Sequence, residues 1–175
     1  MSAYKIIDLK NWKRAIHCEV FRKSMQPQYG VSFELDITNF LKIIREKGYS
    51  FTFSFVYIVS KCANECEEFR YRFQDGEVVL FDRIDTSFTY MDEGAELFKV
   101  VNVPMKDSLE EYVKAAEETV SAQKEYFTGP MGNDLFQFSG MPGFLLPMFP
   151  ILIPGTTKRL PRCSTGGNIS NGMEK

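Results

Sequence analysis

The sequence is poor in histidine, with His17 as its single imidazole among 175 residues. It also lacks an export signal, because the opening stretch MSAYKIIDLKNWKR contains no continuous apolar segment and no small-residue cleavage site. Nothing in these residues directs the chain to secretion. We therefore expect a cytoplasmic protein.

The sequence shows no excess of one charge sign. Its 21 basic residues nearly balance 23 acidic ones, which gives a net charge of -2, and the basic residues are scattered rather than clustered. Binding to a phosphate backbone has little electrostatic support, so we do not expect nucleic acid as a partner. A composition of 44% hydrophobic and 25% charged residues is typical of a soluble globular protein, and one domain is expected.

Cysteine is also sparse, with four residues that we expect to remain thiols in a chain without an export signal. Cys62 and Cys66 are four residues apart and could share one face of a helix. Two thiols without a neighbouring histidine or a second cysteine pair do not complete a metal site. We therefore expect no bound metal.

The first half of the chain mixes helical and strand-like patterns. Apolar residues at four-residue spacing predict an amphipathic helix over 11–24, with one stripe facing a core. Residues 31–37 alternate between apolar and polar side chains, which predicts a half-buried strand, and a helix over 38–47 ends at Gly48. The segment 51–69 has the aromatic and β-branched start of a strand but the length and end of a buried helix, and we favour the helix.

The second half predicts antiparallel sheet followed by a helix. The dipeptide Asp75-Gly76, a common hairpin turn, separates two strand-like runs, and further runs cover 86–91 and 96–101. A capping box opens the clearest helix of the chain, over 108–124, and 135–139 resembles one more strand. These elements predict an α/β fold, a two-layer sandwich of helices on a largely antiparallel sheet.

The stretch SGMPGFLLPMFPILIPG, residues 139–155, departs from this regular pattern. Its prolines each remove a backbone donor and fix φ, so neither a helix nor a central strand can run through it. The apolar run is too short and too broken to span a bilayer, and it lacks the regular PxxP spacing and the charge of a docking peptide. We expect no membrane partner.

Several stretches together resemble the chloramphenicol acetyltransferase family, in order and spacing, over nearly all of residues 4–142. They are DLKNWKRAIHCEVF (8–21), LDITNFLK (35–42), EEFRYRFQDGEVVLFDRIDTSFTY (67–90), ELF (96–98) and FQFSGMP (136–142). The resemblance implies a homotrimer of two-layer α/β subunits, each with a mixed sheet and helices on one face, and active sites between neighbouring subunits. It also implies acetyl transfer from acetyl-CoA to a hydroxyl of chloramphenicol or a related small acceptor.

Enzymes of this family take the acceptor proton with a histidine in a C-terminal HHxxxDG motif, since an alcohol is a weak nucleophile until a positioned base removes its proton. This sequence contains no HHxxxDG, and His17 falls on a first-helix position that is not the catalytic one. We therefore expect a chain without the base and without activity. The lipoamide acyltransferase core shares this fold and motif but usually ends a longer chain with lipoyl and linker regions, so it ranks lower.

The resemblance assigns further roles residue by residue. Ser139 falls on the serine whose hydroxyl donates to the oxyanion of the tetrahedral intermediate, although a serine at the end of a strand is often a turn former. Arg14 falls on the arginine that pairs with the aspartate of HHxxxDG, and without that aspartate we expect a solvated charge worth little to stability. The matches to acceptor-pocket positions, for which a plain apolar role is equally open, are Val20, Phe21, Met25, Phe98 and Phe127.

The family continues after the Met-Pro of this region with a tryptophan and polar strands, so the sequence departs from the family at Gly143. If codons compatible with residues 143–175 are read one nucleotide earlier, they can encode a sequence that resembles the family. We hypothesise a one-nucleotide frameshift near the Gly143 codon. It would divide the chain into a C-terminally incomplete acetyltransferase-like domain, 1–142, and an apolar, Pro-rich, divergent and disordered tail, 143–175. The alternative to an inactive family member is a non-catalytic remnant that binds intact homologous subunits.

Overall fold

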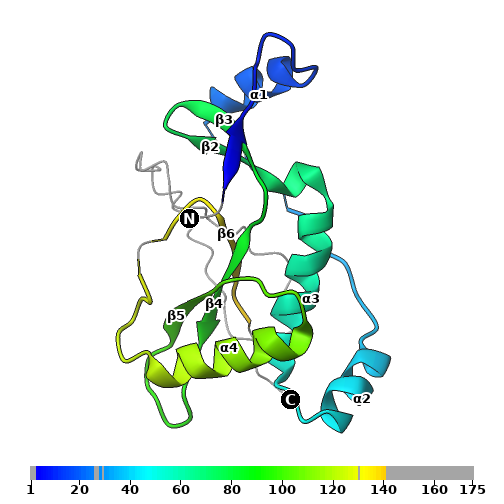
Figure 1. Cartoon of the computed structure of the whole chain (residues 1–175), viewed down its shortest axis with the longest axis vertical. Helices are drawn as coiled ribbons and strands as arrows, with labels where there is room; N and C mark the ends of the chain where they lie inside the picture. Colours follow the sequence, from blue (N-terminus) through cyan, green and yellow to red (C-terminus); the bar gives the residue numbers. More distant parts are fainter. Residues whose placement is uncertain (1–2, 26–27, 29, 130, 141–175) are drawn as a thin grey trace, which may run out of the picture.

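A computed structural model describes residues 3–25, 28, 30–129 and 131–140. In these residues α1 lies at one end of the long axis, while α2 and α4 lie toward the other (Figure 1). In chain order the elements are β1 (Tyr4–Ile6), α1 (Ala15–Arg22), α2 (Thr38–Glu46), α3 (Phe51–Glu65), the 3-10 helix η1 (Glu67–Arg70), β2 (Tyr71–Gln74), β3 (Glu77–Phe81), β4 (Asp85–Tyr90), β5 (Lys99–Val103), α4 (Leu109–Ala122) and β6 (Leu135–Phe138).

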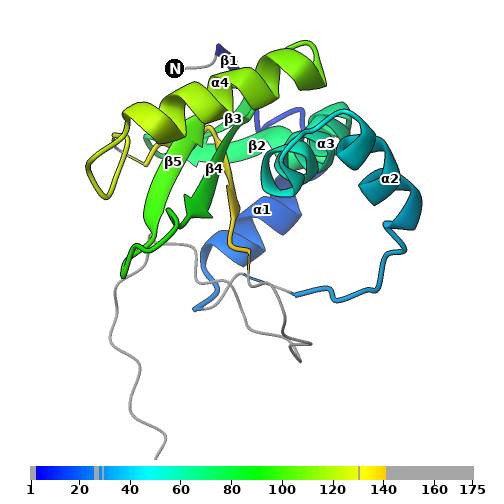
Figure 2. The same ribbon diagram turned by 90° about the horizontal axis from the view of Figure 1, so that it is seen from below.

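The strands of the described residues form two small sheets, ordered β1-β3-β2 and β5-β4-β6. The strand pairs are antiparallel except for β4 with β6, which run parallel. Helices α3 and α4 cover one face of the β5-β4-β6 sheet (Figure 2). The fold is therefore the predicted α/β arrangement of a mixed, largely antiparallel sheet with helices on one face.

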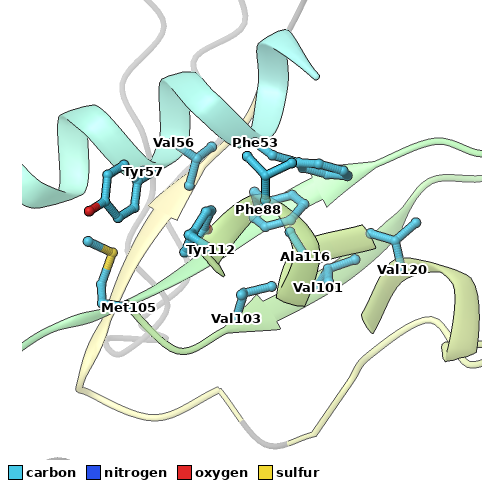
Figure 3. Packing of buried hydrophobic residues seen from close by; sticks show 11 residues of the cluster. Phe53, Val56, Tyr57, Phe88, Val101, Val103, Met105, Tyr112, Ala116 and Val120 are labelled. Carbon is cyan, nitrogen blue, oxygen red and sulfur yellow. The ribbon is translucent and has the colours of Figure 1, made fainter. Parts of the chain in front are cut away.

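Strand β4 lies at the centre of the main core, because its inward side chains pack against both helices. The ring centroid of Phe88 lies 5.6 Å from that of Phe53 on α3. Phe88 also shares one buried cluster with Tyr112 and Ala116 of α4 (Figure 3). Complete burial of a side chain such as Phe88 is worth roughly 1.5–3 kcal/mol, so this contact determines which face of β4 lies inside.

A polar pair lies within this core. The Thr86 hydroxyl donates to the Val103 carbonyl oxygen at 2.7 Å, and Tyr112 Oη lies 2.6 Å from Thr86 Oγ1. Because the one hydroxyl proton of Thr86 is used, Tyr112 is the donor of the second bond. Burial raises the pKa of the Tyr112 phenol, so the phenol keeps its proton and can donate.

Turn and cap signals in the sequence act as predicted. Asp75 and Gly76 have φ values of 51° and 88°, the positive values of a two-residue hairpin turn between β2 and β3. Gly48, with a φ of 69°, follows the end of α2. The Ser108 side chain accepts from the Glu111 amide while the Glu111 carboxylate accepts from the Ser108 amide, which confirms the capping box of α4.

Helix α3 confirms the helical interpretation of the ambiguous segment 51–69. Its buried side chains Phe53, Val56 and Tyr57 are spaced three and four residues apart on one face. The Tyr57 hydroxyl at the edge of this face donates to the Asp107 carbonyl at 3.0 Å. The aromatic residues at the start of the segment therefore belong to a helix that packs on the sheet, and not to a strand.

The strand predicted over 31–37 is wrong. The structure has no strand there, and Val31, Phe33 and Leu35 are 73%, 79% and 63% exposed. An alternating pattern forms a strand only where a neighbouring strand completes its hydrogen bonds, and no strand of the described residues pairs with this segment. The alternation therefore marks an apolar face that the described residues leave open.

Helix α1 is shorter than the predicted range of 11–24, and its apolar stripe does not face a core. None of its residues is buried, and Ile16 and Val20 are 62% and 59% exposed. The physical reason is that polar and aromatic contacts, not the apolar stripe, hold the helix on the β2–β3 hairpin.

Two strand boundaries also differ from the prediction. Strand β1, which pairs with β3, is not predicted, because Tyr4–Ile6 is too short a run to show alternation. Strand β5 begins at Lys99 rather than at 96. The chain is still turning before this point, with a φ of 77° at Gly94.

The tail predicted over 143–175 lies outside the described residues, as does the predicted domain boundary at 142. Within the described ranges no helix is long and apolar enough to cross a membrane. The same ranges contain no group of three histidine, cysteine or acidic residues that could hold a metal ion.

The capping box gives a testable prediction for stability. Ser108→Ala removes the side chain that accepts from the Glu111 amide, and we expect it to lower the free energy of unfolding by about 1 kcal/mol. Ser121→Ala, an exposed serine of the same helix, is the matched control and should change it by less than about 0.5 kcal/mol. Urea denaturation of both variants measures the difference, and equal effects would contradict a role for the cap.

Candidate functional site

The candidate site lies on the outer face of the β5-β4-β6 sheet, opposite α3 and α4. Side chains alternate along β4, so Thr86 and Phe88 face the core while Ser87 and Thr89 face outward. The outer face carries an open hollow of about 130 Å³, which we name the sheet-face hollow. Its lining residues are Ser87, Phe88, Thr89, Val100, Met131, Gln137, Phe138 and Ser139.

Ser139 reaches this hollow because β6 runs parallel to β4. The register places Gln137 beside Ser87 and Phe138 beside Phe88, and Ser139 follows directly after the strand. Ser139 is exposed, so its hydroxyl is accessible to a ligand in the hollow. Hydroxyl and amide groups of this kind donate hydrogen bonds to a carbonyl oxygen or an oxyanion.

Among the described residues, those that line the hollow include no group that acts as a general base near neutral pH. They have hydroxyl, amide, thioether and hydrocarbon side chains, without imidazole, carboxylate or amine. His17 lies instead on α1, where it is exposed, at one end of the long axis (Figure 1). The lining can therefore stabilise negative charge on oxygen, but it has no means of deprotonating an alcohol.

Phe98 and Phe127 are brought together through a third aromatic ring. The ring centroid of Tyr126 lies 5.5 Å from that of Phe98 and 4.7 Å from that of Phe127. The Val100 amide donates to the Tyr126 carbonyl at 2.7 Å, which holds this segment along β5. The three rings are 42–50% exposed and form one surface, which we name the aromatic wall.

The other three predicted pocket residues do not join this wall within one chain. Val20 and Phe21 lie on α1 and Met25 follows it, at 59%, 59% and 98% exposure. Helix α1 lies at one end of the long axis, whereas the β4–β5 connection that carries Phe98 lies toward the other (Figure 1). The structure therefore divides the predicted acceptor residues into two groups that are far apart.

Helix α1 is held with its apolar stripe outward by contacts to η1 and the β2–β3 hairpin. The Arg14 guanidinium lies 2.6 Å from a Glu68 carboxylate oxygen, and the rings of Trp12 and Tyr71 lie 5.1 Å apart. The Arg22 guanidinium donates to the Gly76 carbonyl and lies 4.7 Å from the centre of the Phe73 ring. These contacts use the residues that flank the stripe, so Val20 and Phe21 are left facing solvent.

Arg14 is therefore paired with Glu68, although its side chain remains half exposed to solvent. Its hydrogen bond to Glu68 raises the pKa of the Arg14 guanidinium and holds the pKa of the Glu68 carboxyl below its ordinary value. Both side chains are at least half exposed, so solvent screens the pair and its contribution to stability is small. The expected small effect on stability follows from this geometry, but the partner differs from the one that the family motif implies.

Sequence reasoning missed several residues that the structure places at the site. Tyr126 links Phe98 to Phe127, and Gln137 lines the hollow beside Ser87. A signal for Gln137 was present, because it stands between apolar neighbours in the run LFQF and must face away from the core. No comparable local signal marks Tyr126, whose position depends on the pairing of its segment with β5.

Comparison with known proteins identifies the family. A family model described as chloramphenicol acetyltransferase matches residues 2–160. The chain belongs to the chloramphenicol acetyltransferase family. The chloramphenicol acetyltransferase of Proteus mirabilis is 29% identical over 140 residues, covering 78% of this chain and 64% of the relative. Chloramphenicol acetyltransferase 2 of Escherichia coli is 30% identical over 129 residues, covering 73% and 60%.

A relative with lower sequence identity matches a larger part of the chain. The Staphylococcus aureus chloramphenicol acetyltransferase is 26% identical over 172 residues, covering 94% of this chain and 78% of the relative. A solved chloramphenicol acetyltransferase structure is similar with a TM-score of 0.65 and 26% identity, covering 89% of this chain and 71% of that one. These matches confirm the predicted family and fold. The chain spans less than two thirds of the Proteus mirabilis and Escherichia coli relatives, and the family match runs past the predicted boundary at 142.

The Arg14–Glu68 pair gives a prediction with a definite pH direction. Arg14→Gln removes the guanidinium, whose hydrogen bond and charge lower the pKa of Glu68, so that pKa should rise toward its ordinary value. A carboxyl with a lowered pKa stabilises the fold above its ordinary pKa and loses this contribution as pH falls through the lowered value. In the variant, protonation of Glu68 should therefore contribute less to the loss of stability at low pH.

Titration of the side-chain carboxyl carbons by NMR measures this shift. Glu19, whose pKa is lowered by its hydrogen bond to Lys23, is an internal control that Arg14→Gln should leave unchanged. A Glu68 pKa that stays at its wild-type value in the variant would show that the pair does not form in solution.

Proposed function

We propose that this chain carries the scaffold of an acetyl-CoA-dependent O-acetyltransferase but has little or no transfer activity of its own. Its acetyl donor would be acetyl-CoA and its acceptor chloramphenicol or a related small hydroxylated molecule, in the cytoplasm. Membership of the chloramphenicol acetyltransferase family supports the class of reaction. The observation that supports the proposal of inactivity is the lack of an HHxxxDG motif in the sequence, together with a sheet-face hollow whose described lining residues include Ser139 but no general base.

The chemistry of the transfer explains why the base matters. The acceptor oxygen forms a bond to the acetyl carbon, the carbon–sulfur bond of the thioester breaks, and the acceptor proton must pass through a base to the departing thiolate. We infer that the Ser139 hydroxyl donates to the oxyanion that forms in between. This contribution lowers the barrier but leaves the acceptor alcohol protonated, so it does not suffice.

The proposal includes assembly into a homotrimer with sites between copies. Within one chain the two groups of predicted acceptor residues lie far apart, one on and after α1 and the other in the aromatic wall. The outward stripe of α1 and the exposed apolar residues of 31–37 offer a surface that a neighbouring copy can cover. We infer that Val20, Phe21 and Met25 of one copy face the aromatic wall of the next.

The division of the chain into residues 1–142 and a divergent tail, 143–175, is part of the proposal. Its support is the proline-rich apolar run that begins near Gly143, although the family match itself extends to residue 160. The coding DNA around the Gly143 codon tests the origin of this change. A single-base correction that restores a tryptophan and a downstream HHxxxDG is expected, and its absence would rule out a one-nucleotide frameshift.

A second candidate function is a non-catalytic subunit that binds intact homologous subunits. The outward apolar stripe of α1 favours it, because such a surface binds a similar subunit whether or not the hollow is active. Co-expression of the chain with a full-length family member distinguishes this function. Stable co-purification through the α1 face would favour it over a chain that only associates with its own copies.

The proposed inactivity predicts the outcome of a thiol-release assay with acetyl-CoA and chloramphenicol. The purified chain should release thiol at the rate of uncatalysed hydrolysis, and both His17→Gln and Ser139→Ala should give the same rate. An intact family member is the positive control. Turnover by the unmodified chain well above the uncatalysed rate would contradict the proposal, and its loss in His17→Gln would assign the base to His17.

The proposed assembly predicts a different effect for a charge on α1. Phe21→Glu places a carboxylate on the outward stripe and should weaken self-association at least about tenfold, because an unpaired charge is costly to bury. Ile43→Glu, at a 52% exposed position of α2, is the matched control and should leave association unchanged. Sedimentation velocity measures both, and equal association of the two variants would show that α1 is not the contact surface.

A further inference from the structure

Lys99 is a cation in an unusual position at the start of β5. Its side chain is only 11% exposed. The ammonium nitrogen lies 2.8 Å from Asp92 Oδ2 and donates to the carbonyl oxygens of Val120 at 2.7 Å and Gln123 at 3.2 Å. These partners match the three protons of the ammonium group. Because the last carbonyls of a helix are partly negative and lack helical partners, Lys99 fastens β5 to the C-terminal end of α4.

The inward position of Lys99 has a consequence for Phe98. Lys99 pairs with Tyr90 across the β4–β5 ladder, and the Tyr90 ring stacks on Phe53 of α3, so Lys99 lies on the helix side of the sheet. Neighbouring side chains point to opposite sides of an extended chain. Phe98 is therefore directed to the outer side, where its ring meets that of Tyr126.

Gln123 continues the same set of contacts into the segment that carries the rest of the aromatic wall. Its side-chain amide nitrogen donates to the carbonyl oxygens of Val100 at 2.9 Å and Glu125 at 2.8 Å. Its side-chain oxygen accepts from the Thr128 hydroxyl at 2.7 Å. The Thr128 amide in turn donates to the Val100 carbonyl at 3.2 Å. One side chain thus closes the turn over 123–128 and holds it against β5.

We propose that Lys99 and Gln123 form a clamp that positions Phe98, Tyr126 and Phe127 as one aromatic wall. The two residues are joined directly, because the Lys99 ammonium donates to the Gln123 carbonyl. Lys99 sets the direction of Phe98, and Gln123 sets the position of Tyr126 and Phe127. Both are positioning residues, and the role of the wall in holding a chloramphenicol-like acceptor rests on the proposed function.

Hydrogen–deuterium exchange of the full chain tests the clamp without any ligand. In Lys99→Met and Gln123→Ala, amides over 98–103 and 123–129 should exchange at least about tenfold faster, because charge-assisted and multiple hydrogen bonds are lost. Exchange over the β2–β3 hairpin should stay unchanged, which separates local release from general destabilisation. Lys114→Met, an exposed lysine of α4, is the matched control and should resemble the wild type.

The milder variant Asp92→Asn removes one partner of Lys99 and keeps its bonds to α4, so its exchange should fall between the wild type and Lys99→Met. Unchanged exchange over both segments in Lys99→Met and Gln123→Ala would overturn the clamp. An equal increase over the whole chain would also overturn it, because the contacts would then support the fold in general rather than the wall.

Calorimetric titration with chloramphenicol separates the clamp from the proposed function. The wild type and Lys114→Met should bind equally, and Lys99→Met should bind at least about fivefold more weakly if the loosened wall is the acceptor surface. Equal binding by Lys99→Met with faster exchange would overturn the role of the clamp at the acceptor site. A wild-type chain that does not bind chloramphenicol would count against the proposed function, while the exchange result still decides whether the clamp exists.

Discussion

The alternation of side chains along β4 is the constraint on which the rest of the structure depends. Phe88 is fixed between α3 and α4, and Thr86 is hydrogen-bonded to Tyr112 and Val103 on the same side. Because a strand has a period of two, a register shift of one residue would turn these side chains away from the core and direct their neighbours Ser87 and Thr89 into it. The outward direction of Ser87 and Thr89 at the sheet-face hollow therefore follows from the packing on the inner face.

The pairing of β4 with β6 extends this constraint to Ser139. The parallel register continues the division between inner and outer faces, so Phe136 and Phe138 are half-buried toward the core while Gln137 lies on the outer side. Ser139 then follows the last paired residue and lines the hollow. Its position depends on β6 being held beside β4, and Asn133 and Arg72 support this by hydrogen bonds between the start of β6 and β2.

Helix α1 shows how far the sequence could predict the structure and where it could not. Local signals were sufficient for the capping box at Ser108, the hairpin turn at Asp75 and the helical start of α3, since each depends on residues close in the chain. The amphipathic pattern of α1 predicted a helix correctly but the wrong environment. An apolar stripe indicates that the helix packs against another surface. It does not indicate whether that surface belongs to the same chain or to another one.

The sequence pattern also could not predict what covers residues 31–37 or which residues meet at the candidate site. The alternation of Val31, Phe33 and Leu35 indicates a half-covered surface, but the described residues of one chain supply no strand to pair with it. The resemblance placed Phe21 and Phe98 in one pocket, whereas the fold separates them within a chain. Tyr126 and Gln123 could not be found at all, because their roles arise from long-range contacts with β5.

Binding of chloramphenicol by mixed chains tests most directly whether the site forms between copies. Phe21→Ala and Phe98→Ala are expected to bind poorly when each is studied alone. If Phe21 of one copy faces Phe98 of another, a mixture that has exchanged subunits contains interfaces with both phenylalanines intact, and a fraction of the binding sites should return. A mixture that binds no better than either variant alone would contradict a site that is shared between copies.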